Sequence, residues 1–218
     1  MSSFDTEVLW RSLPFLWNGM LLTLQLTGMA VVGGLLLGTV LAVARLSPIK
    51  PLSWLVAAYV NFLRSMPLIL VIFWFYTLVP RIIGRSVSGF DSVLIAFIMF
   101  EAAYYSEIIR AGISSVRRGQ ISAAMALGLT NIQAMRYVVL PQAIRNMIPV
   151  LLTQSIVMFQ DTALVYVVGL RDFLTSADIV ASRDNRPIEM YLTVAAVFLV
   201  ICFSASRLVN LLRRRYTI

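Results

Sequence analysis

Three charged residues stand inside long apolar stretches of this sequence, namely Arg64, Glu101 and Asp161. A charge near the centre of a lipid bilayer costs about 2.5–3.5 kcal/mol on insertion scales, so each of them needs a functional or structural reason. Groups of this kind can bind a charged solute or an ion on its way across a membrane. Three further polar side chains lie near Asp161 in the sequence: Gln154, Gln160 and Thr162.

Each of these residues allows two interpretations. The polar face around Asp161 either lines a path and binds the α-amino group or the side chain of a substrate, or it forms a hydrogen bond between helices that fixes their packing. Arg64 either supplies a cation for an acidic substrate, or it snorkels to the interface or pairs with a neighbouring carboxylate. Glu101 either lines the path or pairs with Arg64 or with a tyrosine hydroxyl.

The sequence argues against catalysis by the chain itself. It has no histidine, which excludes histidine metal sites and histidine-activated nucleophiles. The single lysine, Lys50, is followed by Pro51, so there is no G-x-x-x-x-G-K-[ST] loop to hold ATP phosphates. The lone Cys202 cannot form an intrachain disulfide. We therefore expect a non-enzyme that binds no metal or cofactor and uses energy made by a partner.

The composition is typical of a membrane protein. Hydrophobic residues make up 60% of the chain and charged residues 13%, whereas soluble domains average about 25% charged residues. A helix that crosses the hydrocarbon core needs roughly 20 mostly apolar residues. The predicted fold is an all-α polytopic membrane protein with five spans, at about 19–44, 54–79, 92–113, 147–170 and 190–212.

Two spans have unusual features. The second contains Arg64 and Pro67, and its apolar part after Pro67 is too short to cross, so we expect it to enter obliquely and bend near that proline. The first contains Gly33, Gly34 and Gly38, which predict a face that packs closely on another helix. Outside the membrane domain at 19–212, residues 1–18 are predicted to form a periplasmic or interfacial segment, and residues 213–218 a basic tail.

The distribution of charge predicts the orientation. The net charge of +8 would suggest nucleic acid as a partner of a soluble chain, but here it is interpreted through the positive-inside rule, with lipid headgroups and not nucleic acid as partners. Segments with basic residues only alternate with segments of mixed charge. This alternation predicts a periplasmic N-terminus, a cytoplasmic C-terminus and a cytoplasmic connection at about 114–145.

That connection contains a stretch, from Ser122 to Arg145, that is amphipathic, basic and too polar to span. Ala123, Ala124 and Leu127 form an apolar face at helical spacing. We interpret the stretch as a helix–Gly–helix knob that docks into another protein; the alternative is a surface helix that rests on lipid headgroups through its arginines. The expected breaks are a C-cap at Gly128, an N-cap at Thr130 or Asn131, and a bend or helix start at Pro141.

The same stretch resembles the EAA loop of the transmembrane subunits of bacterial ATP-binding-cassette importers. That loop reads EAA, three residues, Gly, nine residues, Ile, one residue and Leu-Pro. This sequence matches the spacing, with a serine in place of the glutamate and a valine in place of the isoleucine. The matching residues are Ser122, Ala123, Ala124, Gly128, Val138, Leu140 and Pro141.

Two more motifs resemble the polar amino-acid branch of that family. Residues 62–68, FLRSMPL, resemble its Phe-Arg-Gly-Thr-Pro-Leu signature, and residues 160–164, QDTAL, resemble its Lys-Asp-Thr-Ser-Leu. Within the branch, FEAAYYSEIIRAGI and LLTQSIVMFQDTALVYV look most like glutamate/aspartate import permeases. Gln160 stands where those relatives usually carry lysine, which makes Arg64 the best candidate for the cation that reads an acidic side chain.

The resemblance implies a type I importer (MetI-like) fold in the bacterial inner membrane. It also implies three protein partners: a cytoplasmic ATPase that carries ATP and Mg²⁺ and receives the EAA loop, a second five-span permease subunit that is a copy or a paralogue, and a periplasmic or surface amino-acid-binding protein. The implied substrate is a polar L-amino acid, with glutamate or aspartate expected.

Two other functions remain open. A stand-alone channel or ion-coupled carrier would use Asp161 as a proton or cation site and would work without ATP. A membrane scaffold without transport would tolerate changes at Gln160, Asp161 and Arg64. Neither function needs a Gly-x₉-[I/V]-x-Leu-Pro knob, so the importer subunit is the favoured hypothesis.

Overall fold

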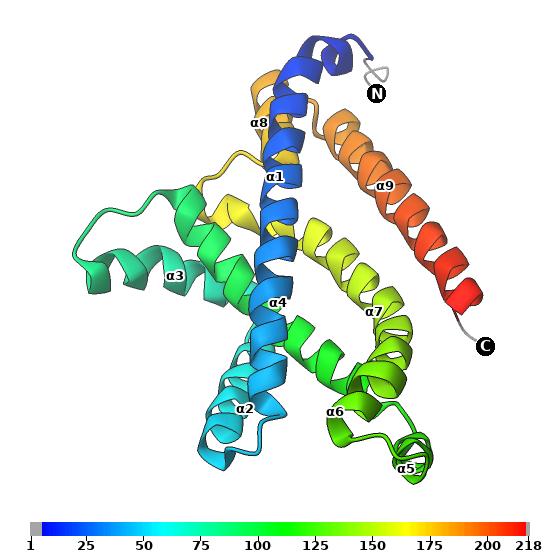
Figure 1. Cartoon of the computed structure of the whole chain (residues 1–218). Coiled ribbons are helices and arrows are strands. Elements are labelled where there is room, and N and C mark those ends of the chain that lie inside the picture. Colours follow the sequence, from blue (N-terminus) through cyan, green and yellow to red (C-terminus); the bar gives the residue numbers. More distant parts are fainter. Residues whose placement is uncertain (1–5, 217–218) are drawn as a thin grey trace.

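The computed structural model describes residues 6–216, and these residues are almost entirely helical (Figure 1). The first five residues of the predicted N-terminal segment and the last two of the predicted tail lie outside the described residues. The elements are α1 (Thr6–Arg45), α2 (Lys50–Arg64), α3 (Leu68–Ile83), α4 (Gly89–Ser114), α5 (Arg118–Ala126), α6 (Asn131–Ala134), the π-helix η1 (Met135–Val139), α7 (Leu140–Asp161), the 3₁₀-helix η2 (Thr162–Val168), α8 (Phe173–Asp184) and α9 (Pro187–Tyr216).

Within the described residues, four helical runs are long and apolar enough to cross a membrane. They are Thr6–Arg45, Gly89–Ser114, Asn131–Val168 and Pro187–Arg214. The pair α2 and α3 adds a fifth span if it is counted as one, but the chain bends by 108° between its two helices. The predicted bend near Pro67 is therefore confirmed. Its cause is local, because a proline disfavours helical backbone in the residue before it, and Pro67 is the extended N-cap of α3.

The first helix is longer than a single span requires. α1 is continuous through the predicted boundary between residues 18 and 19. Its 40 residues correspond to about 60 Å at 1.5 Å per residue, roughly twice the thickness of the hydrocarbon core. In Figure 1, α1 runs along most of the molecule, with α8 beside its N-terminal half and α2, α5 and α6 at the opposite end.

Glycines bring α1 close to α4, as their pattern in the sequence predicted. An added Cβ at Gly34 would lie 2.7 Å from Cβ of Glu101, and one at Gly38 would lie 2.8 Å from Cβ of Tyr105. Gly33 faces Ile98 at a similarly short distance. Because no side chain separates the two backbones here, α1 and α4 form the most extensive helix contact of the structure.

The helix α8 was not predicted. Asp172 caps it by accepting hydrogen bonds from the backbone N–H groups of Leu174 and Thr175, and it ends at Asn185 in the left-handed conformation. Burial raises the pKa of the Asp172 carboxyl above its ordinary value, although the hydrogen bonds from Thr175 and Leu174 oppose this shift. α8 packs on α1 at Gly19, where a Cβ would collide with Ser176. Its amphipathic 12 residues are too short and too polar to resemble a span.

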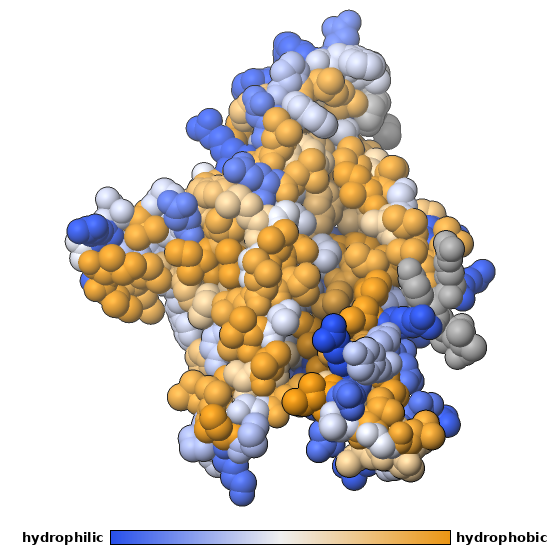
Figure 2. All heavy atoms as spheres, viewed as in Figure 1, coloured by the Kyte–Doolittle hydropathy of each residue, from blue (hydrophilic) through white to orange (hydrophobic). Residues whose placement is uncertain are grey.

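The surface is apolar over most of its middle. Figure 2 shows hydrophobic residues across the centre of the visible face, while hydrophilic residues gather toward the ends of the molecule. At one end Arg11 of α1 pairs with Asp184 of α8 at 2.9 Å. Many large apolar side chains of α1 and α9 are exposed, as expected for helices whose outer faces contact lipid or another membrane subunit.

The glycine contact between α1 and α4 generates a stability prediction. Gly34→Ala forces the two helices apart at Glu101, and overpacking of this kind costs about 1–3 kcal/mol. We expect a lower unfolding temperature in detergent, measured by fluorescence. The matched control is Gly28→Ala in the same helix, because a Cβ at Gly28 meets nothing within 4 Å. Equal unfolding temperatures for the two variants would contradict the packing argument.

Candidate functional site

Polar side chains form a line of contacts between α4 and α7. Gln154 Nε2 donates to Glu101 Oε1 at 3.1 Å, and the hydroxyls of Tyr105 and Ser155 lie 3.1 Å apart. Toward the other end of α4, the side chain of Asn146 donates to Ser115 Oγ at 2.9 Å. These contacts connect α4, the third predicted span, to α7, the fourth, at several levels along the two helices.

Glu101 is the charged residue of this line of contacts, and it is fully buried. Its exposed fraction is 0%, and its Oε2 atom has no hydrogen-bond partner among the described residues. Arg64, one of the two partners expected for Glu101, forms no salt bridge with it in the described part of the chain, and Gln154 donates to Glu101 instead. The alternative of a tyrosine partner is closer to the structure, since Tyr105 also interacts with Glu101. Glu101 is thus enclosed by α1, α4 and α7.

Asp161 lies at the point where α7 changes into the 3₁₀-helix η2. It is half-buried and lies within electrostatic range of Glu101. Thr162 is fully buried and donates to the carbonyl oxygen of Phe159 at 2.7 Å, so it stabilises the change of helix type. Gln160 is exposed. The structure therefore brings Glu101, Gln154 and Asp161 into one region, and Gln160 does not share their burial.

Arg64 ends α2 immediately before the break that precedes α3. Its guanidinium carbon lies 5.4 Å from the ring centroid of Tyr104, in the geometry of a cation–π contact, and the residue is exposed. Tyr104 belongs to the same helix as Glu101. Within residues 6–216 Arg64 forms no salt bridge, and it lies near α4 through the Tyr104 ring and within electrostatic range of Glu107.

A second charged cluster lies farther along α4. Glu107 and Arg110, at i,i+3 spacing on α4, form an ion pair in which Arg110 Nε donates to Glu107 Oε2 at 3.0 Å. The sequence did not indicate the third member, Arg45, whose Nη1 lies 2.6 Å from Glu107 Oε2. Arg45 is the last residue of α1, so this cluster fastens the end of α1 to α4.

The helix–Gly–helix knob has the predicted breaks. Gly128 has φ +85°, the left-handed conformation that favours glycine after a helix. Thr130 caps α6 in a capping box with Gln133, and Pro141 lies in the first turn of α7. The π-helix η1 joins α6 to α7 without a loop, which the sequence did not predict.

The knob exposes apolar side chains at its tip. Leu127 is 83% exposed and Ile132 81% exposed, and they flank the turn at Gly128. Ala124, before the turn, and Ala134, after it, are buried. The predicted apolar face is therefore split, because Ala124 faces the protein whereas Ala123 and Leu127 are exposed. Of the other residues of the EAA-like pattern, Ser122 and Pro141 are exposed and Leu140 is half-buried.

Comparison with known proteins adds to this geometry. Residues 34–218 match the family model described as "Binding-protein-dependent transport system inner membrane component". The chain is 51% identical to the glutamate/aspartate import permease protein GltK of Escherichia coli O6:H1, over 99% of both chains. It superposes on a chain of a crystal structure of an amino acid ABC transporter with histidines, with TM-score 0.92, 36% identity and coverage of 98% of this chain and 100% of that one.

A more distant structure shows the fold alone. The alignment with a chain of the MetNI methionine ABC transporter in an inward-facing conformation covers 100% of both chains, with TM-score 0.72 and 22% identity. The predicted all-helical MetI-like fold is confirmed by this similarity.

The Glu101–Gln154 contact generates a second prediction. Gln154→Leu leaves the buried carboxyl of Glu101 without its hydrogen bond, which costs about 1–3 kcal/mol or more for a charged group. We expect a lower unfolding temperature, measured in detergent. Gln25→Leu on the exposed face of α1 is the control, since Gln25 is exposed. If both variants unfold like the original chain, the contact does not hold α7 against α4.

Proposed function

Because the chain belongs to the family of binding-protein-dependent transport system inner membrane components, we propose that it is the membrane-spanning permease subunit of an ATP-driven importer of polar L-amino acids, with glutamate and aspartate as substrates. The end-to-end identity of 51% with GltK supports this substrate class. The observation that carries the coupling role is the exposed apolar tip of the knob at Leu127 and Ile132.

The proposed coupling follows from the chemistry of that tip. Two large apolar side chains exposed to water on a polar connection gain about 1.5–3 kcal/mol each when a partner covers them. Small residues beside them, such as Ser122 and Ala123, allow close approach of another surface. We propose that a groove of a cytoplasmic ATPase subunit receives this tip and that ATP and Mg²⁺ are bound there and not by this chain.

The proposed substrate path passes Gln154 and Asp161, with the buried carboxyl of Glu101 behind Gln154. Carboxylates and an amide oxygen suit the α-ammonium group common to amino acids, because they accept hydrogen bonds from it. An acidic side chain would need a cation, and Arg64 is the candidate, since its guanidinium lies against the ring of Tyr104, which belongs to the same helix as Glu101. Gln160 and Thr162 complete the proposed set, with Thr162 shaping the backbone.

The proposed assembly contains two permease subunits, a copy or a paralogue of this chain, together with the ATPase and an amino-acid-binding protein. The exposed apolar faces of α1 and α9 support it, because one chain with four or five spans does not by itself surround a path. In this assembly the bent pair α2–α3 counts as one of five spans, with the N-terminus periplasmic and the knob and C-terminus cytoplasmic. The alternation of basic and mixed segments supports that orientation.

Disturbing the knob tests the coupling. Gly128→Val places a β-branched residue at φ +85°, which displaces the turn between Leu127 and Ile132. We expect glutamate uptake by cells to fall at least about tenfold, and the ATPase subunit to be lost from affinity purifications, while the amount of chain in the membrane stays unchanged. Gly84→Val is the control, because Gly84 has φ +70° and lies in the connection after α3. Normal uptake by the Gly128 variant would show that the knob does not couple.

Transport by purified components tests the path. We expect Asp161→Asn to lower glutamate uptake into liposomes by roughly tenfold or more, because a neutral amide binds an ammonium group more weakly. The liposomes contain the permease, its ATPase and its binding protein, and uptake should require ATP. Asp178→Asn is the control, because Asp178 is exposed on α8 and an asparagine there still accepts from Tyr191. ATP-independent uptake by the chain alone would instead favour the carrier hypothesis.

A further inference from the structure

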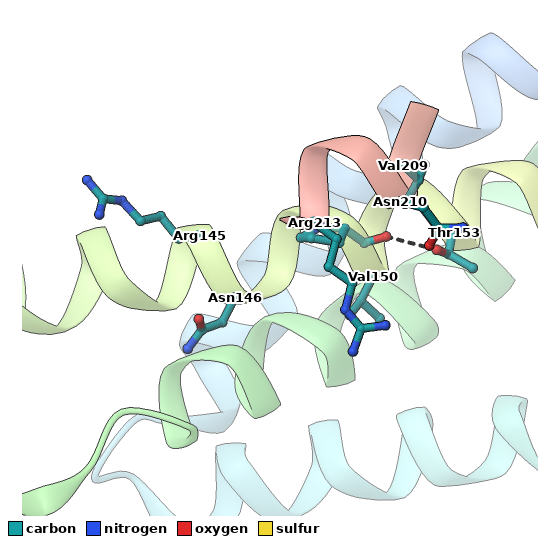
Figure 3. Close-up of a pocket in the computed structure, with 8 residues that line it drawn as sticks. Arg145, Asn146, Val150, Thr153, Val209, Asn210 and Arg213 are labelled. Atoms are coloured by element: carbon teal, nitrogen blue, oxygen red, sulfur yellow. Dashed lines mark hydrogen bonds between the residues drawn. The ribbon is translucent and has the colours of Figure 1, made fainter. Parts of the chain in front are cut away.

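A groove runs along the contact of α7 and α9, and it shares only Asn146 and Ser155 with the line of contacts between α4 and α7. Near the C-terminal end of α9 it widens into a cavity of about 450 Å³. Figure 3 shows Arg145, Asn146 and Thr153 of α7 and Asn210 and Arg213 of α9 around this cavity, which we call the basic cavity. In this view Arg213 extends over Val150 of α7, while Arg145 projects from the far end.

The lining of the basic cavity is suited to a negatively charged group. Among the described residues that line it there are two arginines, two asparagines and no acidic residue. A neighbouring cavity shares Asn210 and Arg213 and adds Arg207 and Arg214, again without an acidic lining residue in the described part of the chain. The sequence explains the bias, because both helices lack Asp and Glu over the relevant lengths, 140–160 and 190–216. Guanidinium groups and side-chain amides donate hydrogen bonds, and phosphate oxygens accept them.

The groove becomes apolar away from the arginines. A second cavity of about 270 Å³ continues along the same two helices and shares Val209 with the basic cavity. Its lining is almost wholly hydrophobic, with Ile156 and Phe159 from α7 and Ile201, Ala205 and Leu208 from α9. One groove therefore has a cationic, hydrogen-bonding end and an apolar length. These two parts match the charged headgroup and the acyl chain of an anionic phospholipid.

When α9 spans the membrane, the basic cavity lies at the level of the lipid headgroups. From Pro187 to Arg213, α9 rises by about 39 Å at 1.5 Å per residue, whereas the hydrocarbon core is about 30 Å thick. Arg213 thus lies beyond the core when α9 spans the membrane, and the apolar part of the groove lies within it. Basic pockets between transmembrane helices at this level are suited to anionic headgroups.

We propose that the α7–α9 groove is a binding site for an anionic phospholipid, with its phosphate at Arg213 and Asn210, Arg145 at the entrance, and an acyl chain along Ala205 and Ile156. A free phosphate would occupy only the basic cavity and would not need the apolar continuation. A second protein subunit seated here would need acidic residues to face the arginines, whereas a second copy of α7 or α9 has none in these ranges. The lipid therefore fits both ends of the groove.

Native mass spectrometry of the purified full-length protein with added lipid tests the proposal. The probes are dioleoyl phosphatidylglycerol, the matched neutral-net-charge lipid dioleoyl phosphatidylcholine, and soluble glycerol 3-phosphate. We expect the original chain to retain phosphatidylglycerol in preference to phosphatidylcholine. Glycerol 3-phosphate at the same concentration should not displace the bound phosphatidylglycerol. The double variant Arg145→Gln/Arg213→Gln should bind phosphatidylglycerol roughly 30-fold more weakly, since each arginine near the surface attracts an anionic lipid.

Two variants keep the test specific. Arg81→Gln/Arg85→Gln removes the same charge from exposed positions outside the groove and should leave lipid retention unchanged. Ala205→Phe fills the apolar length without changing charge, and it should weaken retention of phosphatidylglycerol on its own. The proposal is overturned by equal retention of the two lipids on the original chain, by equal retention on the two arginine pairs, or by displacement of the lipid by glycerol 3-phosphate, which would identify a simple anion site.

Discussion

The close approach of α1 to α4 is the constraint on which the rest of the structure depends. Gly34 and Gly38 remove the side chains that would otherwise separate the helices, so Glu101 and Tyr105 pack directly against the α1 backbone. The carboxyl of Glu101 is then enclosed on one side by α1 and receives its hydrogen bond from Gln154 of α7 on the other. Because a buried carboxyl without a hydrogen bond is costly, this contact also stabilises the position of α7 against α4. At the end of the same interface, Arg45 binds Glu107.

The connection between the knob and the polar line is helical throughout. From Asn131 to Val168 the backbone passes through α6, η1, α7 and η2 without a loop. The knob at Ile132 and the residues Gln154 and Asp161 therefore belong to one continuous helical run. In the proposed transporter this continuity gives a mechanical reason for placing an ATPase contact beside Gly128, because the positions of the substrate-path residues follow the position of the tip. The π-helix and the change to 3₁₀ geometry at Thr162 are the two places along the run where its winding changes.

The packing of α9 on α7 differs from the packing of α1 on α4. It contacts α7 and α8, and between α7 and α9 the packing leaves the groove with its arginine end and apolar length. Tight glycine-mediated packing at α1–α4 and open packing at α7–α9 thus coexist in one chain. The first contact encloses Glu101, whereas the second leaves arginines lining a cavity.

The sequence by itself determined the class of protein, its long apolar helices, the bend at Pro67, the glycine face and the breaks of the knob. Each of these depends on local chemistry: hydropathy over about 20 residues, the lost N–H of proline, the conformational freedom of Gly128, or the capping side chain of Thr130. Only the tertiary structure decided that Glu101 binds Gln154 and not Arg64, that Arg45 joins Glu107, and that Ile132 is exposed beside Leu127. These contacts join residues as far as 62 positions apart or depend on which face of a helix is covered. The physical reason is that hydropathy reports the cost of burying a side chain but does not say which helix buries it, and that choice is made by the packing of α1, α4 and α7 together.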